Sequence, residues 1–596
     1  MTNRILAGVG SFVTASLLLC GEAGAVSAWT QRFYDNQNTT NVGDDPSLTP
    51  DSVTHLKSQA SDVVPIRQCV PRPGATVNHT PVVSDGLLFF GDSCGYFYVV
   101  DLTQGRKRLI FLDTGTVGPP NTGITGALDT VAAELGTYTG VQATPLIATV
   151  TVPDSPTVSH EEKRIYIGLD HQDKSLWCLN VDKIITDRLS LDNLSLGPND
   201  AGVYSCSGRS WPMSLAAQPV SGNESVLNGS AHFSKAQAIK VKLPDGSPGT
   251  EIHDVLFQPS TGLDCANGQF WALDAVTGEK LWIFDAVQNG DGQGGTIWSV
   301  PAMGKDGTVY LTTGDCVQKP QVGEKAESLV ALDPTDGTVK WFHQRRLTDT
   351  QDFDIGNSPT VVDVPDGNGG YICQNIVSID KDGCIYGFKQ AEDIPDIGEP
   401  GFDPLRLGQQ RVLWRACFAP GSLGGGFDAS GASFHGRSVF AQSNQAFGHL
   451  PTDDVNAFSV DACTGAFQWA SSSIGLGWGE GAIASGMFFQ PTGSGRELQV
   501  VSADAGSGHL PTLLATVALP AAVAEGGGGP AIVDGAIYLP SSAGVVIVSV
   551  DPSASSPPVH HGKDAFHGPY PLPIAAAPPA TYVPNPNSPY LDLLKK

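Results

Sequence analysis

Short apolar runs separated by polar turns recur along this chain, and they predict a protein built from β-strands. In the clearest copies, Asp, Gly and Trp follow one another at intervals of four residues, namely Asp274, Gly278 and Trp282, then Asp333, Gly337 and Trp341, then Asp461, Gly465 and Trp469. An apolar strand ends at the Asp, and the turn up to the Gly reverses the chain. The Trp on the next strand is expected to pack between neighbouring sheets.

Each copy follows another apolar strand, and the pattern extends over eight units. They span 87–101, 164–182, 254–285, 308–341, 375–389, 438–469, 482–516 and 529–551. Four-stranded units that recur along a chain close into a propeller, because closure removes open sheet edges. The prediction is an all-β, eight-bladed β-propeller. Seven blades is the alternative, since the second and seventh units are weakest. Segments 112–140 and 183–250 are interpreted as loops on one face.

Composition agrees with this fold class. The chain has 596 residues, including 70 Gly and 43 Pro, and only 16% are charged. Such a composition suits many turns better than long helices. A repeat protein can accommodate this length in one body. The propeller is predicted at 29–551, and the Pro-rich residues 552–596, which show no periodic pattern, are predicted to be a C-terminal tail.

The N-terminus has the features of a secretory signal peptide, predicted at residues 1–28. Arg4 supplies the positive end, residues 12–19 form the apolar core, and small residues between 23 and 28 offer cleavage sites. The apolar run is too short to span a membrane, and no other segment is long and apolar enough. A secreted or periplasmic protein without a membrane span is therefore expected, and the choice between these two locations stays open.

Charge and cysteine content narrow the classes of partner. The formal net charge is −26, which disfavours nucleic acid and anionic membranes and suits hard cations or basic partners. Of 11 cysteines, removal of Cys20 with the signal leaves an even number, as expected for disulfides in an oxidising compartment. Cys373 with Cys384, and Cys69 with Cys94, are candidate pairs, although the sequence does not fix the connectivity.

An acidic stretch, Asp-Thr-Gln-Asp-Phe-Asp at 349–354, follows the unit that ends at Trp341. Side chains two residues apart in extended chain point the same way. Asp352 and Asp354 can therefore face one cation, or one can bind the cation while the other accepts a proton. A solvated acidic loop is the alternative interpretation.

The repeat resembles the blade motif of the eight-bladed quinoprotein alcohol dehydrogenases. Within that family, the chain most resembles the polyvinyl alcohol dehydrogenase type. The opening Trp29 and residues 35–39 resemble the first segment of that family. The resemblance covers 29–551 in architecture and is specific between about 255 and 390. It implies pyrroloquinoline quinone (PQQ), a flat anionic cofactor that needs an aromatic floor, a hard cation, a cationic side chain and a base.

The resemblance assigns these roles one position at a time. Trp298, at the end of Gly-Gly-Thr-Ile-Trp, resembles the indole under the quinone. Lys381 resembles the cationic side chain beside the quinone oxygens, so it is both a cofactor-binding and a catalytic candidate. Asp352 matches the catalytic base. An ordinary core tryptophan and a hairpin-turn lysine are the alternatives for Trp298 and Lys381.

Three further acids resemble metal ligands. Asp315 stands where many family members have Asn, and it is also a cofactor-site candidate. Asp264 matches a metal-binding Glu of the family, whose side chain is one methylene longer. Asp354 matches an acid that completes a lanthanide site in some branches of the family. With Asp352, these carboxylates would repel one another without a cation. Ca²⁺ or a lanthanide ion is therefore expected. Turn or surface-loop acids are the alternatives for Asp264 and Asp315.

The function implied by the resemblance is oxidation of a small or polymeric alcohol or polyol. The cation acts as Lewis acid, Asp352 removes the alcohol proton, and electrons pass to an external acceptor such as a cytochrome c, because no Cys-x-x-Cys-His haem motif is encoded. Unlike many family members, the chain has no adjacent cysteine pair. The alternative is a non-catalytic propeller used for binding or assembly, which convergence of Trp298, Asp315, Asp352 and Lys381 would disfavour.

Overall fold

The structure is a computed structural model. It describes residues 28–67, 75–113, 141, 143–169, 175–197, 201–208, 213–214, 225–226, 229–243, 245–262, 268–287, 295–314, 324–346, 355–390, 394–400, 409–417, 432–442, 455–472, 480–492, 496–503, 512–523 and 528–551. The predicted signal peptide, apart from Ala28, and the predicted tail lie outside these ranges. The boundaries of both therefore stay predictions.

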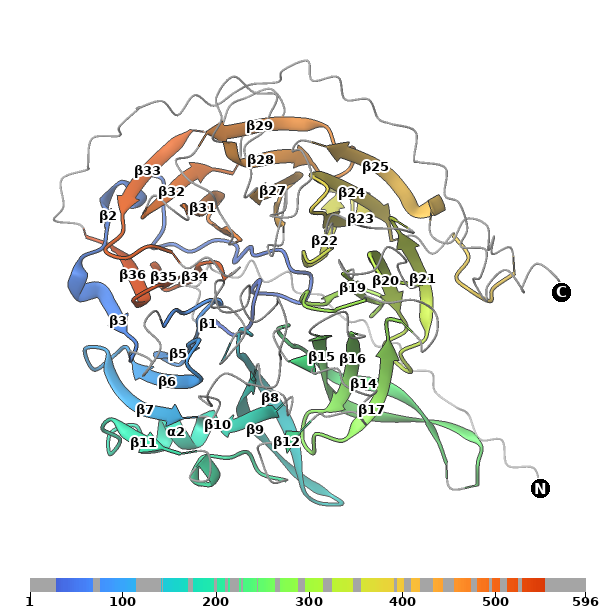
Figure 1. The fold of residues 1–596 in the computed structure, drawn as a ribbon, viewed down its shortest axis with the longest axis horizontal. Helices are drawn as coiled ribbons and strands as arrows, with labels where there is room; N and C mark the ends of the chain where they lie inside the picture. The colour runs from blue at the N-terminus through green and yellow to red at the C-terminus, as the bar shows by residue number, and fades with distance from the viewer. Residues whose placement is uncertain are drawn as a thin grey trace, which may run out of the picture.

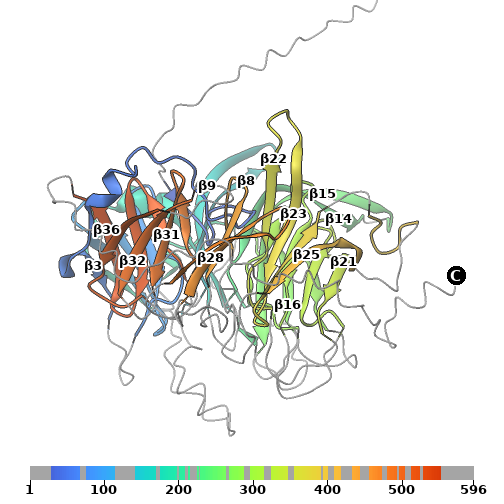
Figure 2. The ribbon, with the colours of Figure 1, turned by 90° about the horizontal axis from the view of Figure 1, so that it is seen from above.

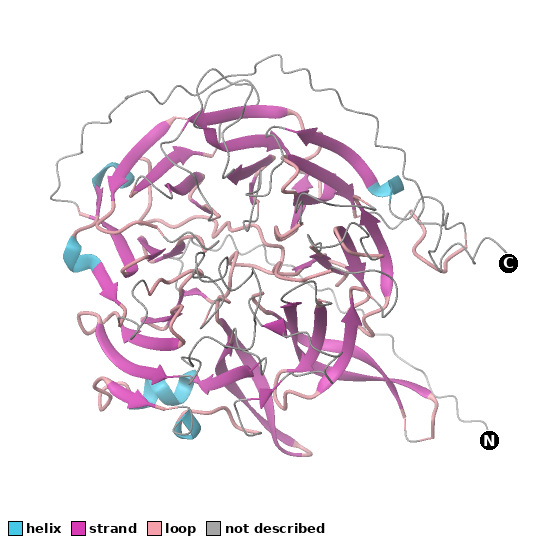
Figure 3. Ribbon diagram, in the orientation of Figure 1, coloured by secondary structure: helices cyan, strands magenta, loops and turns pink. Residues whose placement is uncertain are grey.

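Eight β-sheets surround a central axis, as Figures 1 and 3 show, and this confirms the predicted eight-bladed, all-β propeller. Blade 1 contains β1 (Ala28–Trp29), β4 (Val82–Ser84), β5 (Leu87–Gly91), β6 (Tyr96–Asp101), β7 (Lys107–Asp113) and β11 (Leu194–Leu196), and blade 2 contains β8 (Leu146–Ser155), β9 (Val158–Gly168), β10 (Ser175–Asn180) and β12 (Met213–Ser214). Blade 3 contains β13 (Ser225–Val226), β14 (His232–Lys242), β15 (Pro248–Gly262), β16 (Gln269–Asp274) and β17 (Lys280–Asp285). Blade 4 contains β18 (Ala302–Met303), β19 (Val309–Thr312), β20 (Ser328–Leu332) and β21 (Val339–Gln344).

The remaining blades follow the same order. Blade 5 contains β22 (Thr360–Pro365), β23 (Tyr371–Ile379), β24 (Cys384–Lys389) and β25 (Val412–Cys417), and blade 6 contains β26 (Ser433–His435), β27 (Ser438–Gln442), β28 (Val455–Asp461) and β29 (Phe467–Ser472). Blade 7 contains β30 (Ala482–Ala484), β31 (Met487–Thr492), β32 (Glu497–Ser502) and β33 (Leu513–Ala518). Blade 8 contains β34 (Ala531–Val533), β35 (Ala536–Ser541) and β36 (Gly544–Val550) with β2 (Leu56–Lys57) and β3 (Val63–Pro65). Helical turns are η1 (Ser52–His55), η2 (Ala60–Asp62), α2 (Val181–Asp187), η3 (Ala201–Val203) and η4 (Gln409–Arg411). Within the described ranges, no helix has the length and apolar character needed to cross a membrane.

The ring is closed by strands from opposite ends of the chain. The short strands β2 and β3 pair antiparallel with β36, with Leu56 opposite Val550 and Val63 opposite Val546. Together they supply the outer edge of the eighth blade, so the last sheet is completed by residues from the beginning of the chain. β2 and β3 thereby cover the backbone donors and acceptors along the outer edge of β36.

An N-terminal strap, residues 28–48, crosses the inner strands of the ring (Figure 1). Backbone amides of successive inner strands donate to its carbonyls: Ile147 to Thr30, Met303 to Asn36, Val361 to Gln37, Phe434 to Thr39 and Ile483 to Thr40. The side chain of Asn38, which is fully buried, donates to the carbonyls of Val300 at 3.1 Å and Pro359 at 2.8 Å. The strap therefore satisfies backbone groups of several blades that would otherwise be unpaired.

The repeat motif joins one blade to the next. The Asp274 carboxylate accepts from the Thr277 amide at 2.6 Å, which fixes the turn. Trp282 donates to the carbonyl of Pro334 at 2.9 Å and lies against Gly337 of the following blade. The predicted packing of this Trp between sheets is thus confirmed. Trp414 lies in the same way against Gly465, although its strand was not among the predicted copies.

The interpretation of 183–250 as loop is wrong in part, because β14, the inner strand of the third blade, lies within it. Much of β14 extends beyond the ring in a hairpin with β15, and its sequence lacks a run of apolar residues. Only the stretch Ile239-Lys240-Val241-Lys242 alternates large apolar and polar residues, which is at the short limit of a strand signal. Figure 2 shows the β22–β23 hairpin also projecting from the ring.

The disulfide prediction for Cys373 and Cys384 is wrong. Cys384 lies directly opposite Cys417 across β24 and β25 and is bonded to it. Cys373 bonds to Cys463, in the turn after β28 of the next blade. A third bond joins Cys178 to Cys206. Cys94 is disulfide-bonded, but Cys69 lies outside the described residues, so their pairing stays a prediction.

Candidate functional site

The propeller has two faces, and the described candidate residues lie on one of them. At what we call the site face, β17, β19, β21 and β23 end, and the connections to the next inner strands begin. At the opposite hairpin face, the β18–β19 and β22–β23 hairpins turn. Trp298 precedes β18 and Lys381 follows β23, so both belong to the site face.

The connection that carries Trp298 is fixed by three hydrogen bonds to two neighbours, Gly314 and Ser358. The Gly295 amide donates to the Gly314 carbonyl at 2.9 Å, and the Gly314 amide returns a bond to Thr296 at 2.8 Å. The Val300 amide donates to the Ser358 hydroxyl at 2.8 Å. Bonds before and after Trp298 therefore hold its backbone against blades 4 and 5, which restricts where the indole can lie.

One edge of the Trp298 indole rests on a glycine. A Cβ added at Gly356 would lie 2.7 Å from the Cε2 and Cζ2 atoms of the indole, too close for any other residue without movement. Among the residues that the structure describes, the buried Nε1 atom of Trp298 has no hydrogen-bond partner. The half-buried indole therefore offers a flat aromatic surface that fits a planar ligand.

Lys381 lies over the Trp298 indole, with its Nζ atom 5.3 Å from the ring centroid. The side chain is buried, being only 3% exposed. This distance is within the range of a cation–π contact. Two residues separated by 83 positions are thus brought together, as the prediction of a shared site requires, and the pair combines a flat surface with a positive charge suited to an anionic quinone.

The hairpin that carries Lys381 is a tight turn held by its own backbone. The Gly383 amide donates to the Asp380 carbonyl at 3.0 Å, and Gly383 has a φ of +80°, which favours glycine. The Asp380 carboxylate accepts from the Asp382 amide at 3.1 Å. The interpretation of Lys381 as a hairpin residue is therefore correct, and it coexists with the contact to Trp298.

The acids beside Lys381 belong to a buried cluster of charges that sequence reasoning missed. Asp380 contacts Arg345 at 2.8 Å and Arg346 at 2.9 Å, and Arg346 also contacts Asp382 at 3.1 Å and Glu327 at 2.8 Å. Burial alone would lower the pKa of Arg346, but the charges of Asp380, Asp382 and Glu327 raise it above its usual value. The available signal was the Arg-Arg pair directly before an acidic stretch.

The four acids predicted to bind metal or act as base, Asp264, Asp315, Asp352 and Asp354, lie outside the described residues. Their nearest described neighbours in sequence include Gly262, the last residue of β15, Gly314, two residues after the end of β19, and Ile355, next to Gly356. Within the described ranges, no group of three or more His, Cys, Asp or Glu could hold a metal ion. The metal ligands thus stay a prediction.

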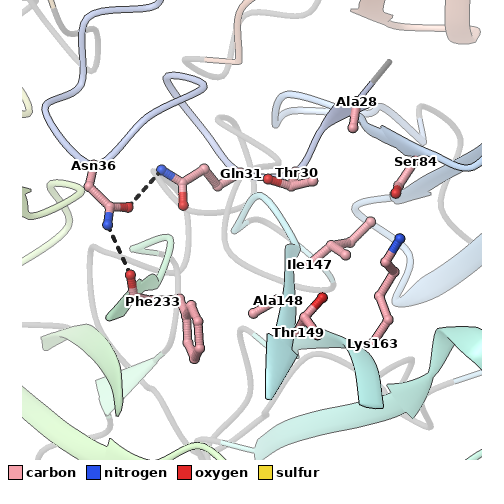
Figure 4. A pocket seen from close by; sticks show the side chains of 10 residues that line it. All are labelled: Ala28, Thr30, Gln31, Asn36, Ser84, Ile147, Ala148, Thr149, Lys163 and Phe233. Atoms are coloured by element: carbon pink, nitrogen blue, oxygen red, sulfur yellow. Dashed lines mark hydrogen bonds between the residues drawn. The ribbon is translucent and has the colours of Figure 1, made fainter. Parts of the chain in front are cut away.

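A separate hollow of about 410 Å³ lies at the hairpin face. Its lining includes Gln31 and Asn36 of the strap, with Phe233 and Lys163 from neighbouring blades, and Figure 4 shows Gln31 donating to Asn36 beside it. Neither Trp298 nor Lys381 lines this hollow. It is therefore distinct from the candidate site.

The fold is an eight-bladed β-propeller, and the contact between Lys381 and Trp298 lies in the stretch where the resemblance to the quinoprotein alcohol dehydrogenases is most specific. Residues 252–397 match the family model for the β-propeller domain of glucose, ethanol and alcohol dehydrogenases. The resemblance to the PQQ-dependent alcohol dehydrogenase-like family is confirmed over this stretch. The narrower resemblance to polyvinyl alcohol dehydrogenases stays a prediction.

Two curated relatives come from Gluconobacter oxydans (strain 621H). The glycerol dehydrogenase large subunit is 30% identical over 122 residues, which are 17% of this chain and 16% of the relative. The quinoprotein glucose dehydrogenase is 27% identical over 124 residues, 17% of this chain and 15% of the relative. The match thus spans about a sixth of each relative's length.

Solved structures share the fold over most of the chain. A europium-containing methanol dehydrogenase has a TM-score of 0.55 at 14% identity, covering 86% of this chain and 89% of its own. The quinohemoprotein alcohol dehydrogenase from Comamonas testosteroni has a TM-score of 0.56 at 16% identity, covering 90% and 82%. At these identities the likeness establishes the architecture.

Proposed function

We propose that this protein is a secreted or periplasmic quinoprotein oxidoreductase that oxidises an alcohol or polyol. The observation that carries this proposal is the placement of Lys381 over Trp298, 5.3 Å from the ring centroid. Both residues lie inside the stretch that matches the PQQ-dependent family. A buried lysine that faces an indole is an unusual feature for a purely structural propeller, because lysine side chains are rarely so deeply buried.

The described residues would hold the quinone in a defined way. Trp298 would support one face of the ring, because Gly356 fixes the edge of the indole. Lys381 would place its ammonium near the quinone oxygens, where a positive charge stabilises negative charge that develops during the reaction. When bound, PQQ supplies the two-electron acceptor for the alcohol.

The remaining roles belong to the acids of the sequence-based prediction. Asp352 would accept the proton of the alcohol hydroxyl as general base. Asp264, Asp315 and Asp354 would hold Ca²⁺ or a lanthanide, since carboxylate oxygens are the ligands that hard cations prefer. Electrons would then leave to an external acceptor such as a cytochrome c.

Reconstitution of the purified mature protein tests the proposal. PQQ is added with Ca²⁺ or with a lanthanide ion, binding is measured by quenching of tryptophan fluorescence, and dye reduction is assayed with small alcohols, polyols and polyvinyl alcohol. Saturable binding with metal-dependent dye reduction is the expected result. If the protein neither binds PQQ nor oxidises an alcohol with any of these ions, the scaffold alternative is favoured.

A further inference from the structure

Lys381 is flanked in sequence by two acids that are themselves shielded from water. Asp380 is fully buried, and the side chain of Asp382 is 13% exposed. A carboxylate removed from water must be paired with a positive charge or accept hydrogen bonds, otherwise its ionised form is strongly disfavoured. The groups that compensate Asp380 and Asp382 therefore determine the surroundings of the Lys381 ammonium.

Two consecutive arginines supply much of this compensation. The Arg346 guanidinium reaches Asp380 at 2.9 Å and Asp382 at 3.1 Å, so it spans the residues on both sides of Lys381. Arg345 forms an ion pair with Asp380 at 2.8 Å and donates to the Ser378 hydroxyl at 3.0 Å. An arginine fork can make two directed contacts at once, which a lysine cannot do.

The arginines are themselves held in place. Arg346 contacts Glu327 at 2.8 Å, and the Arg345 amide donates to the Glu327 carbonyl at 3.0 Å. The Arg345 guanidinium also lies 3.8 Å from the ring centroid of Tyr386. The arginine pair thus joins the loop before β20 to the β23–β24 hairpin across the boundary of blades 4 and 5.

The hairpin has further supports on its outer side. Tyr386 donates to the Asp382 carboxylate at 3.0 Å, and Arg415 contacts the same carboxylate at 3.3 Å. Next to Asp382 and Gly383, Cys384 is bonded to Cys417 on β25. These supports hold the turn within its own blade, whereas Arg345 and Arg346 come from the previous blade.

We propose that Arg345 and Arg346 are positioning residues for Lys381. They bind the acids that flank it and thereby fix the lysine hairpin against the connection that leads to the Asp352 segment. Asp352 follows Arg346 by six positions in the sequence. The catalytic significance of positioning Lys381 rests on the proposed function.

Removal of the Arg346 charge has a direct physical consequence. In Arg346→Met, Asp380 keeps Arg345 and Asp382 keeps Arg415, but each carboxylate loses one guanidinium. Lys381 is the cation that lies between these two acids in the sequence. Buried carboxylates that lose part of their compensation recruit other positive charge or become protonated, because burial disfavours an ionised group that is not fully paired. The lysine is expected to turn toward its neighbouring acids and to leave the indole of Trp298.

Competitive labelling of lysine amines, measured by peptide mass spectrometry in the protein without quinone, tests whether Lys381 leaves the indole of Trp298. In the wild type, Lys381 should react slowly, because it is 3% exposed, and Lys240, whose side chain is 54% exposed, provides an internal reference. Arg346→Met should raise the relative labelling rate of Lys381 by about tenfold, since local opening becomes easier. Arg346→Lys should recover only part of the protection.

Arg164→Met provides the matched control. Arg164 is also fully buried and ion-paired, with Glu162 at 2.7 Å, but it lies in blade 2. Loss of its charge should destabilise the protein without changing the labelling of Lys381. If Arg346→Met does not fold, Arg415→Met, which removes a half-exposed contact to Asp382, should raise the labelling by about threefold.

Unchanged Lys381 labelling in a folded Arg346→Met protein, or in a folded Arg415→Met protein where the first does not fold, would overturn the proposal. Equal effects of Arg164→Met would also overturn it, since they would show a general loss of stability. Quinone affinity supplies a second readout: Arg346→Met should weaken PQQ binding by about tenfold, as expected for one misplaced charge contact. If wild-type protein binds no PQQ, the proposed function fails while the labelling result still decides the positioning role.

Discussion

The indole N–H of Trp282 donates to the carbonyl of Pro334 at 2.9 Å, and this bond joins the third blade to the fourth. The same indole covers Gly337, where an added Cβ would lie 2.5 Å from its Cε3 atom. The repeat therefore acts between blades, since the Trp of one copy needs the Gly of the next.

Gly337→Val should lower the free energy of unfolding by about 2–5 kcal/mol, because it combines backbone strain with displacement of the Trp282 ring. Gly337 has a φ of +72°. Gly367→Val is the control, since Gly367 has a φ of +78° but open space around its Cα, and it should cost about 1–2 kcal/mol. Urea unfolding measures both. Equal losses would show that the indole contact adds nothing.

Asn38 of the strap should be a strong contributor to stability. Asn38→Gly keeps the backbone conformation, which has a φ of 59°, but leaves the buried carbonyls of Val300 and Pro359 without their donor. Unsatisfied buried acceptors should reduce the free energy of unfolding by about 2–4 kcal/mol. Asn368→Gly, in an exposed turn, should change it by less than about 0.5 kcal/mol. An unchanged free energy of unfolding in Asn38→Gly would contradict a stabilising role of the Asn38 contacts in the strap.

Stability should fall as the pH decreases below about 6.5. Burial lowers the pKa of His232 to about 3, and that of His343 to about 3 with a smaller effect of Arg345. Burial also lowers the pKa of His79 to about 4. These rings stay neutral in the folded state but bind protons in the unfolded chain below its ordinary pKa.

Each of these histidines should therefore contribute about 1.4 kcal/mol per pH unit to the slope of unfolding free energy between about pH 6 and 4, with stability lost toward acid. His343→Phe should reduce the slope by about a third, if the phenyl ring fits beside Phe388. A slope that does not respond to His343→Phe would contradict the argument.

Trp298→Leu should weaken PQQ binding by about tenfold to a hundredfold, because the flat support for the ring is lost. Trp341→Leu is a control, since Trp341 is buried in the core of blade 4 away from the site face, and it should lower stability more than quinone affinity. Equilibrium titration followed by absorbance of the quinone measures the difference. Equal affinity in Trp298→Leu and wild type would remove Trp298 from the site.

Asp352→Asn should retain quinone binding and lose turnover. The amide has nearly the same shape as the carboxyl group but cannot accept the alcohol proton, and loss of a general base costs about a hundredfold to ten-thousandfold in kcat. Steady-state dye reduction at saturating PQQ and metal measures the effect. Full activity in this variant would require another base.

The sequence was sufficient for the architecture because the repeat encodes it locally. The Asp and Gly of each turn act within a few residues, and Trp282 needs only the next copy. The pairing of Trp298 with Lys381 required the family resemblance, because their positions become neighbours only when blades 4 and 5 pack side by side. Arg346, Gly356 and the partner of Cys373 could not be predicted, since their contacts cross between blades and leave no periodic trace.

The outer strands of the eighth blade come from residues near the start of the chain. During synthesis, β2 and β3 emerge first but cannot find their partner until β36 has been made, almost 500 residues later. A growing or truncated chain therefore keeps exposed backbone donors and acceptors at both ends of an open arc, which invites pairing with other chains. Native assembly is expected to be a post-translational event, and loss of even the last strand should promote aggregation rather than leave a seven-bladed ring.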